Sequence, residues 1–535
     1  MSIESGKNIG MVIGGSLSQG TDVKLNPSTS VEDIKSGQFL TIEGKDGKFF
    51  GVVTDVSLEN TDSSVFSQMT FLENKEVVNA LKGTVAYGKV SLSTNLILPT
   101  GIDSIKTIEP AKTIPDHFSN VQLASELDIQ VVFGEESENN FWIGTPLDMD
   151  TRVCINLEEF VKRSVGVFGK SGTGKTFLTR LLLVGILQHN KASALIFDMH
   201  SEYGQTGQDT DRNMSVKGLK QLFPEKVTVF TLDEESSRRR NSKYDVDAKI
   251  GYHEIEPEDL ELLKESLNLS DIAIAASYVL ERHFGARQWL EQFINLKTND
   301  EVYELADSIG VSPQALRALY ERLNRFKRFG FLVSDSNQDI AIQMIQHVER
   351  GNHVVVEFGR YGDDLAAYIL VSNLLSRRIH RRYVELKEQA LGSSGIEPRP
   401  VIIVLEEAHK FLSPGIANQT IFGTIARELR KYNVTLMVID QRPSAIDSEV
   451  MSQLGTRLTC LLDNERDVDS VLSGMSGSRQ LRTVLSRMEP KQQALLFGHA
   501  VPMPIVIKTR DYGTLEFYSS ITNEETLQQE IDELF

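Results

Sequence analysis

The sequence predicts an α/β protein: a mostly parallel sheet with helices on both faces, interrupted by an inserted helical subdomain and preceded by a small all-β barrel. Before residue 126, short apolar-alternating runs are separated by turn residues. After it, β-branched and aliphatic runs alternate with helix-like segments, which is typical of a parallel sheet. The predicted segments are 1–125 for the barrel, 126–256 and 347–510 for the two parts of the sheet domain, 257–346 for the helical insertion and 511–535 for a C-terminal tail.

The barrel is predicted from its alternating pattern. Residues 38–43 and 48–56 are apolar-alternating runs joined by Gly-Lys-Asp-Gly at 44–47, which is a strong hairpin signal. Further runs lie at 10–13 and 84–93. Several short strands at this spacing indicate a small barrel or a sandwich.

The sheet domain is predicted from apolar runs at 165–168, 194–197, 227–230, 354–358, 401–405 and 435–439. The long interruption between the third and fourth runs has helical periodicity, for example at 258–265 and 318–324. We therefore expect a helical subdomain inserted into the sheet domain.

Composition limits the classes of function. The chain has 535 residues, a net charge of −18 and two cysteines, Cys154 and Cys460, which lie outside any C-x-x-C or Cys/His cluster. This argues against a disulfide framework and a structural zinc site, and it fits a reducing cytoplasm. No apolar stretch approaches the roughly 18 residues that cross a bilayer, and no secretory signal is visible, so we expect a cytoplasmic protein without a membrane partner. The negative charge speaks against nucleic-acid binding over the whole surface but permits a local basic lining.

A phosphate-binding loop is the most specific motif. The pattern G-x-x-x-x-G-K-[ST] is met by Gly169, Lys170, Ser171, Gly172, Thr173, Gly174, Lys175 and Thr176. The glycines let successive backbone N–H groups point at phosphates, and the following helix offers its positive end. Lys175 is expected to reach the β- and γ-phosphates of ATP, and the Thr176 hydroxyl to bind Mg²⁺. The preceding β run and the helix opening at 177–183 favour this interpretation over a chance match.

Acids follow one apolar run directly. The run at 401–405 ends in Glu406 and Glu407, and a buried parallel strand would deliver them to the edge of the sheet where ligands bind. Glu406 is expected to hold Mg²⁺, directly or through water. Glu407 is expected to orient and polarise the attacking water as general base.

Two further strand ends reach the same edge. The run at 194–197 is followed by Asp198, His200 and Glu202, which can position Mg²⁺-bound water or relay nucleotide state, and Asp198 is predicted as a further metal ligand. For His200, a structural role is as well supported as a functional one. Gln441, after the run at 435–439, is predicted to sense the γ-phosphate or the water. The H-x-E and E-x-x-H patterns lack the H-E-x-x-H spacing, which argues against a metalloenzyme.

Basic residues leave alternatives open. Arg430 lies in a basic helix end at 425–432, where such residues complement the helix dipole. It is also a candidate arginine finger entering a neighbouring subunit's ATP site. Residues 238–240 (Arg-Arg-Arg) and Arg360 are candidates for a DNA channel lining or for a solvated surface patch.

Together these motifs resemble the HerA-type hexameric ATPases of the HerA/FtsK superfamily. The resemblance rests on F-F-G-V-V-T-D-V at 49–56, R-x-x-x-x-x-G-x-x-G-x-G-K-T from Arg163, D-x-H-x-E-Y at 198–203, E-E-A-H at 406–409, L-R-K-Y at 429–432 and Q-R-P-S at 441–444. These motifs stand in family order and span most of the chain. The first acid, Glu406, replaces the family's aspartate and still supplies a carboxylate.

The resemblance implies a HAS-type barrel and a RecA-like P-loop NTPase core with an inserted helical bundle. It makes Arg430 a finger acting in trans and Arg163 a second arginine near the nucleotide. It also implies a homohexameric ring whose central channel admits double-stranded DNA. Partners in such families are NurA-like nucleases in DNA end processing, or sirtuin-type and nuclease effectors in anti-phage complexes.

Two main functions follow from the resemblance. The chain is expected to be an ATP-hydrolysing DNA translocase or helicase working with a nuclease or effector. The alternative is an ATP-regulated ring scaffold of an anti-phage defence complex, without processive translocation. A secretion or conjugation ATPase is disfavoured by the lack of a transmembrane segment, and adenylate-type kinases and small GTPases need neither the tandem acids nor the downstream glutamine.

Overall fold

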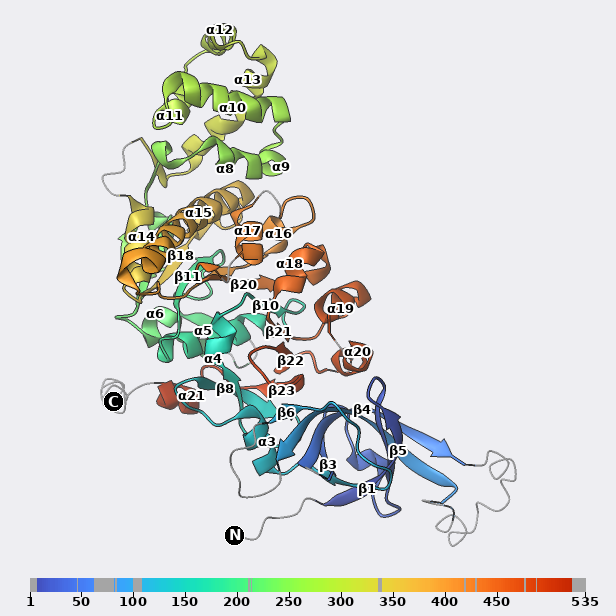
Figure 1. Cartoon of the computed structure of the whole chain (residues 1–535). Helices are drawn as coiled ribbons and strands as arrows, with labels where there is room; N and C mark the ends of the chain where they lie inside the picture. The colour runs from blue at the N-terminus through green and yellow to red at the C-terminus, as the bar shows by residue number, and fades with distance from the viewer. Residues whose placement is uncertain are drawn as a thin grey trace. The chain divides into compact units, whose positions relative to one another are not determined.

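The structure is a computed structural model (Figure 1). It describes residues 7–45, 47–61, 81, 84–99, 108–209, 212, 214–334, 339–417, 420–428, 431–475, 478–486 and 488–521. The chain forms two compact units. The first unit comprises Met1–Leu157, Phe168–Gly174 and Thr456–Arg510, and the second comprises Glu158–Val167, Lys175–Gly455 and Asp511–Phe535.

The first unit contains a closed β-barrel. Its strands are β1 (Asn8–Ser16), β2 (Gly20–Leu25), β3 (Phe39–Glu43), β4 (Gly47–Asn60), β5 (Ala86–Pro99) and β7 (Asn120–Leu123), with the short β6 (Glu109–Pro110) beside β5. The order is β2-β1-β7-β3-β4-β5, and an antiparallel β2–β5 pairing closes the ring. Alternate side chains fill the interior, among them Val23, Leu40, Val53, Val90 and Leu92. The predicted hairpin is confirmed, because Glu43 pairs with Lys48 across the turn.

The same unit also contains antiparallel strands that the sequence did not predict. They are β21 (Thr456–Thr459), β22 (Gln493–Gly498), β23 (Ile505–Thr509), β8 (Asn140–Pro146) and β9 (Val153–Asn156), paired in that order. Among the residues that the structure describes, the helices of this unit with defined bounds are α3 (Glu126–Phe133), α19 (Glu465–Leu472) and α20 (Ser478–Ser486). Ile507 lies opposite Pro146, so these pairs join segments that are far apart in the sequence.

The second unit contains the predicted parallel sheet. The strands are β15 (Val246–Asp247), β14 (Val227–Thr231), β18 (His353–Glu357), β11 (Ser193–Asp198), β19 (Val401–Leu405), β20 (Val434–Asp440) and β10 (Val165–Phe168), in that order. The pairs β14–β18, β18–β11, β11–β19 and β19–β20 are all parallel. Every apolar run predicted as a strand is one, and β19 and β20 are buried along their whole length, as expected of strands covered on both faces.

Helices cover the two faces of this sheet. In Figure 1, α5 (Lys175–Gln188) and α6 (Leu219–Leu222) lie on one side of the strands, and α14 (Ile340–Glu349), α15 (Leu365–Gln389) and α17 (Ile421–Glu428) lie on the other. The shorter elements are α4 (Leu157–Val161), α7 (Glu234–Arg239), α16 (His409–Leu412), α18 (Ser448–Gln453), α21 (Leu515–Ile521), β12 (Gly207–Asp209), β13 (Met214–Val216), β16 (Ile250–Gly251) and β17 (Leu332–Val333). Within the described ranges, no helix is both long and apolar enough to span a membrane.

The predicted insertion is helical. It contains α8 (Pro257–Leu262), α9 (Lys264–Leu267), α10 (Asp271–Phe284), α11 (Trp289–Ile294), α12 (Asn299–Ile309) and α13 (Pro313–Leu323). Helices α8 and α9 lie between α15 and the group α10–α13 (Figure 1). A buried ion pair of 2.9 Å between Arg377 Nη2 on α15 and Asp259 Oδ2 on α8 ties the insertion to the sheet domain. The domain boundaries at 125, 256, 346 and 510 stay a prediction.

Candidate nucleotide-binding site

The phosphate-binding motif adopts the predicted strand–loop–helix form. Strand β10 is fully buried, and helix α5 begins at Lys175. Gly172 and Gly174 have φ of 78° and 93°, which side-chain-bearing residues rarely adopt. At Gly169, a Cβ would lie 2.7 Å from the Cβ of Cys460, so the loop has no room for a side chain there.

Thr176, on the first turn of α5, contacts an acid. Its hydroxyl donates a 2.7 Å hydrogen bond to Oε2 of Glu202, in the loop after β11. The next residue, Tyr203, is fully buried, and its hydroxyl donates to Oε1 of Glu406 at 3.0 Å. This sequence of contacts brings Thr176 and Glu406 to one edge of the sheet in the second unit.

Glu406 is a buried carboxyl at the end of β19. It is 7% exposed, and its Oε2 has no hydrogen-bond partner. Burial, together with the nearby charges of Asp198 and Glu202, raises the pKa of Glu406 well above its ordinary value. The Tyr368 hydroxyl donates to the Glu406 backbone oxygen at 3.0 Å and so holds the strand end. A buried carboxylate oxygen without a hydrogen-bond partner is a suitable ligand for a magnesium ion.

Asp198 shapes the loop that follows β11. Its Oδ1 accepts the N–H of Glu202 at 2.7 Å, and its Oδ2 accepts the N–H groups of Tyr203 and Gly204 at 2.9 and 3.1 Å. Burial raises the pKa of Asp198, and these backbone donors oppose that rise. Direct metal binding by Asp198 would have to compete with these hydrogen bonds. That role stays a prediction, and His200 in the same loop is exposed.

Glu407 is held from two sides. Gln441 Nε2 donates to Glu407 Oε1 at 3.1 Å, and His409 Nδ1 lies 3.5 Å from Glu407 Oε2. Glu407 has φ of +47°, a left-handed conformation that costs about 1 kcal/mol or more in a residue with a side chain. Strain of this kind persists where the surroundings over-determine the conformation, as at many functional sites. Glu407 and Gln441, each predicted separately at a strand end, are therefore in direct contact, while their catalytic roles stay predictions.

His409 completes this cluster through Asp440. The imidazole Nδ1 and the backbone N–H of His409 lie 2.9 and 2.7 Å from Asp440 Oδ2. The hydrogen bond to Asp440 raises the pKa of His409. Potential ligand atoms of Glu407, His409 and Asp440 lie within 4.8 Å of one another. Hydrogen bonds join His409 to Asp440 and Gln441 to Glu407 within this cluster.

Of the two arginines predicted near the nucleotide, the structure describes only Arg163. Arg163 lies beside Gly455, where an added Cβ would approach the Arg163 Cβ to 2.6 Å. Arg430 lies outside the described residues, because the description stops at Glu428 and resumes at residue 431. Its role as a finger, like the role of Arg163 near the nucleotide, stays a prediction.

Three of the four arginines considered for a channel lining are paired with acids. Arg238 forms an ion pair of 2.6 Å with Glu234, one helical turn away. Arg239 forms an ion pair with Glu235 at the same spacing. Arg360 lies 3.0 Å from Glu235 and 3.3 Å from Asp233, and Arg240 donates to Ser201 at 2.8 Å. These pairs reduce the positive field that a row of arginines would present to phosphates.

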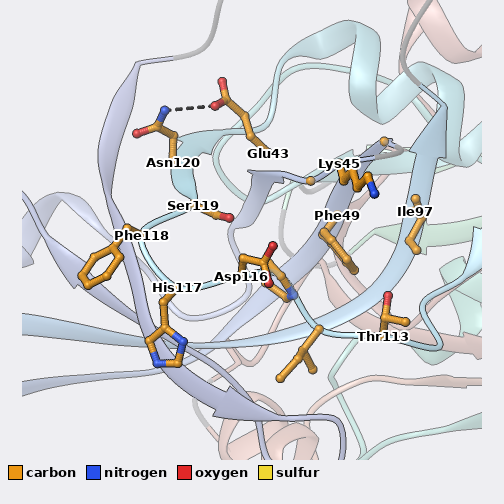
Figure 2. A pocket seen from close by; sticks show the side chains of 14 residues that line it. Glu43, Lys45, Phe49, Ile97, Thr113, Asp116, His117, Phe118, Ser119 and Asn120 are labelled. Atoms are coloured by element: carbon orange, nitrogen blue, oxygen red, sulfur yellow. Dashed lines mark hydrogen bonds between the residues drawn. The ribbon is translucent and has the colours of Figure 1, made fainter.

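The barrel has a hollow of its own. It measures about 520 Å³ and is bordered by the β3–β4 turn and the segment before β7 (Figure 2). Lys45, Asp116 and His117 supply polar groups, while Phe49 and Ile97 supply apolar ones. Asp198, Glu202, Glu406 and Glu407 do not line this hollow, and the sequence identified its border only as a hairpin turn, not as a site.

Two residues of the strand-end cluster were not singled out from the sequence. Tyr203 closes the D-x-H-x-E-Y motif, so its position was a signal that could have been used. Tyr368 lies within α15 and has no local signal. Both are fully buried and both donate to Glu406.

A strand, a glycine-rich loop and a helix, together with strand-end acids that reach the first turn of that helix, define a P-loop ATPase. Comparison with known families refines the class. Residues 141–379 match the model of the helicase HerA central domain, and residues 9–92 match that of the HAS barrel domain.

Curated relatives agree over most of the chain. The DNA double-strand break repair helicase HerA of Pyrococcus furiosus is 23% identical over 540 aligned positions, covering 95% of this chain and 93% of the relative. That of Sulfurisphaera tokodaii is 24% identical, covering 94% and 92%. Among solved structures, VirB4 of Thermoanaerobacter pseudethanolicus superposes with a TM-score of 0.46 and 14% identity, covering 73% of this chain and 100% of that one. The chain thus carries a HAS barrel domain and a HerA-type central ATPase domain, and it is similar to HerA helicases along most of its length.

Proposed function

We propose that this chain is an ATP-driven DNA translocase or helicase that works as a homohexameric ring around double-stranded DNA, in the cytoplasm, with a nuclease of NurA type or another effector as partner. The observation that supports it most is the convergence of Thr176, Glu202 and Glu406 at one sheet edge. The relatives named above are DNA double-strand break repair helicases, which favours DNA as the track.

The residues fit magnesium and ATP. Thr176 offers a hydroxyl and Glu406 an unpartnered carboxylate oxygen, and hard cations prefer such oxygen ligands. When bound, Mg²⁺ would neutralise charge on the β- and γ-phosphates. Asp198 is a further proposed ligand. Lys175 and the backbone amides of residues 169–176 would bind the phosphates.

Hydrolysis would use the cluster at the ends of β19 and β20. Glu407 would accept a proton from water as the water oxygen attacks the γ-phosphorus and the bond to the β-γ bridging oxygen breaks. Gln441 and His409 hold the Glu407 carboxylate in place for this step. Arg430 from a neighbouring subunit would stabilise the charge on the transferred phosphoryl group, with Arg163 near the nucleotide.

A scaffold function is the second candidate. The acid-paired arginines of α7 and its surroundings favour it, because they offer little unpaired charge for DNA phosphates. In that case ATP would control ring assembly around an anti-phage effector without processive movement.

The test measures ATP hydrolysis and displacement of a DNA strand or of a triplex-forming oligonucleotide by the full chain. We expect hydrolysis to be stimulated by double-stranded DNA and to be lost in Lys175→Ala and Glu407→Gln, with nucleotide binding retained in Glu407→Gln. Hydrolysis that persists in both variants would remove these residue roles. Hydrolysis without displacement, even with a co-purified nuclease or NAD-consuming partner present, would favour the scaffold.

A further inference from the structure

Glu202 is fixed by contacts at three points. Its N–H donates to Asp198 Oδ1 at 2.7 Å, and its carbonyl oxygen accepts from Arg180 Nε at 2.6 Å. Its carboxylate is then left to face the Thr176 hydroxyl, 2.7 Å away. The backbone of Glu202 is thus held by two neighbours while its side chain contacts the first turn of α5.

Arg180 is an unusual residue to use for holding a carbonyl. It is 2% exposed, and its guanidinium lies 5.7 Å from the ring centres of both Phe177 and Tyr512. Among the residues that the structure describes, no carboxylate forms an ion pair with it. A buried guanidinium is costly unless it is hydrogen-bonded, and the Glu202 carbonyl accepts both Nε and Nη2 of Arg180. A buried charge is therefore used to set the position of this loop.

The contact with Thr176 has a consequence for metal binding. A threonine hydroxyl has one proton and two lone pairs, and its oxygen can bind a metal only while the proton points elsewhere. A carboxylate that accepts a hydrogen bond from the hydroxyl fixes the direction of the lone pairs on the hydroxyl oxygen. It also adds negative charge just behind the ligand oxygen, as the outer partners of metal ligands generally do.

We propose that Glu202 is a positioning residue of the magnesium–nucleotide site. Its carboxylate accepts a hydrogen bond from the Thr176 hydroxyl and thereby directs a lone pair of the hydroxyl oxygen at the metal. Asp198 and Arg180 hold the backbone of Glu202 in place. This inference rests on the proposed function, since it requires that the chain bind a magnesium nucleotide. It assigns to Glu202 a role distinct from those of Glu406 and Glu407.

The test is a binding titration, so it does not depend on turnover. A fluorescent ADP analogue is titrated into the full-length chain with Mg²⁺ and again with EDTA, and the ratio of the two dissociation constants gives the gain from the metal. Loss of a partner that orients a metal ligand typically costs 10–100-fold in metal affinity, so Glu202→Ala should reduce this gain by about tenfold. Affinity in EDTA should stay unchanged, because the phosphate loop and Lys175 are intact.

Two variants complete the design. Glu202→Gln keeps the size of the side chain and an acceptor oxygen but loses the charge, and it should give a smaller loss in the same direction. Glu158→Ala removes an exposed acid that pairs with Lys162 on the surface, and it should leave the gain as in the wild type.

The outcomes separate the two levels of inference. If Glu202→Ala and Glu202→Gln keep the full gain from Mg²⁺, the inference is overturned while the ATPase assignment stands. Equal losses with Mg²⁺ and with EDTA would overturn it too, because they indicate a general loosening of the loop. A wild-type chain that binds no nucleotide would instead refute the proposed function.

Discussion

Acid should weaken the parallel sheet through one buried histidine. His353, the first residue of β18, is fully buried, and its Nδ1 accepts the backbone N–H of Ala194 on β11 at 3.0 Å. Burial, reinforced by the charges of Arg399 and Lys226, lowers the pKa of His353 from 6.5 to about 3. The folded state therefore keeps a neutral imidazole over a pH range in which the unfolded chain takes up a proton.

The sign and size follow from this difference. The depressed pKa gives full stability above pH 6.5, and stability is lost as the pH falls from 6.5 towards about 3. Relative to pH 8, the loss at pH 5 is about 2 kcal/mol, and over the whole window it approaches about 5 kcal/mol. In His353→Asn the amide oxygen can still accept the Ala194 N–H but does not titrate, so this variant should lack that part of the acid sensitivity.

The assay is hydrogen exchange in increasing urea at about pH 8 and about pH 5, corrected for intrinsic exchange rates and analysed in peptides covering β11 and β18. The wild type should lose about 2 kcal/mol more than His353→Asn between the two conditions. His283→Asn, at an exposed position on α10, is the matched control and should behave as the wild type. Equal pH dependence of the wild type and His353→Asn would show that the imidazole is charged, or solvated, in the folded sheet.

Three further predictions concern the loop, the insertion and the acid cluster. Gly169→Ala should lower nucleotide affinity about tenfold or more in a binding titration, because the loop must shift to admit a Cβ. Wild-type affinity would contradict the crowding at that position. Arg377→Met should destabilise the insertion by about 3 kcal/mol in urea unfolding near pH 8, because Asp259 is left buried without its cation. A smaller loss near pH 6 is expected, since burial raises the pKa of Asp259 to about 6. Tyr203→Phe should slow ATP hydrolysis about tenfold, because Glu406 loses the donor to Oε1. Unchanged turnover would remove Tyr203 from the set that orients Glu406.

Local pattern was sufficient for most of the sheet domain. The run at 401–405 contains no polar side chain, and its short length and β-branched residues favour a buried strand over a buried helix. The same reasoning correctly identified β10, β11, β14, β18 and β20. The glycine-rich loop could also be predicted, because its spacing is required by the close approach of backbone to phosphate.

The antiparallel strands of the first unit were missed for a physical reason. Strands β8, β9, β22 and β23 are short, and their partners lie in distant parts of the chain. Alternation within a short run reports which face is buried but carries no information about the neighbouring strand. Predicting these strands would have required knowing which strand edges of the fold were still without a pairing partner.

The sequence by itself determined which chemical groups are available to this protein: a phosphate-binding loop, tandem glutamates and a strand-end glutamine. It also indicated the resemblance to a family whose members have an N-terminal barrel. Only the tertiary structure decided which of these groups contact one another. It placed Glu202 on the Thr176 hydroxyl, Tyr203 on Glu406, and the carboxylate of Asp198 on three backbone N–H groups. The reason is that residue types and their spacing are set along the chain, whereas which acid meets which hydroxyl depends on the order of β11, β19, β20 and β10 in the sheet. That order arises from long-range packing and cannot be read from local periodicity.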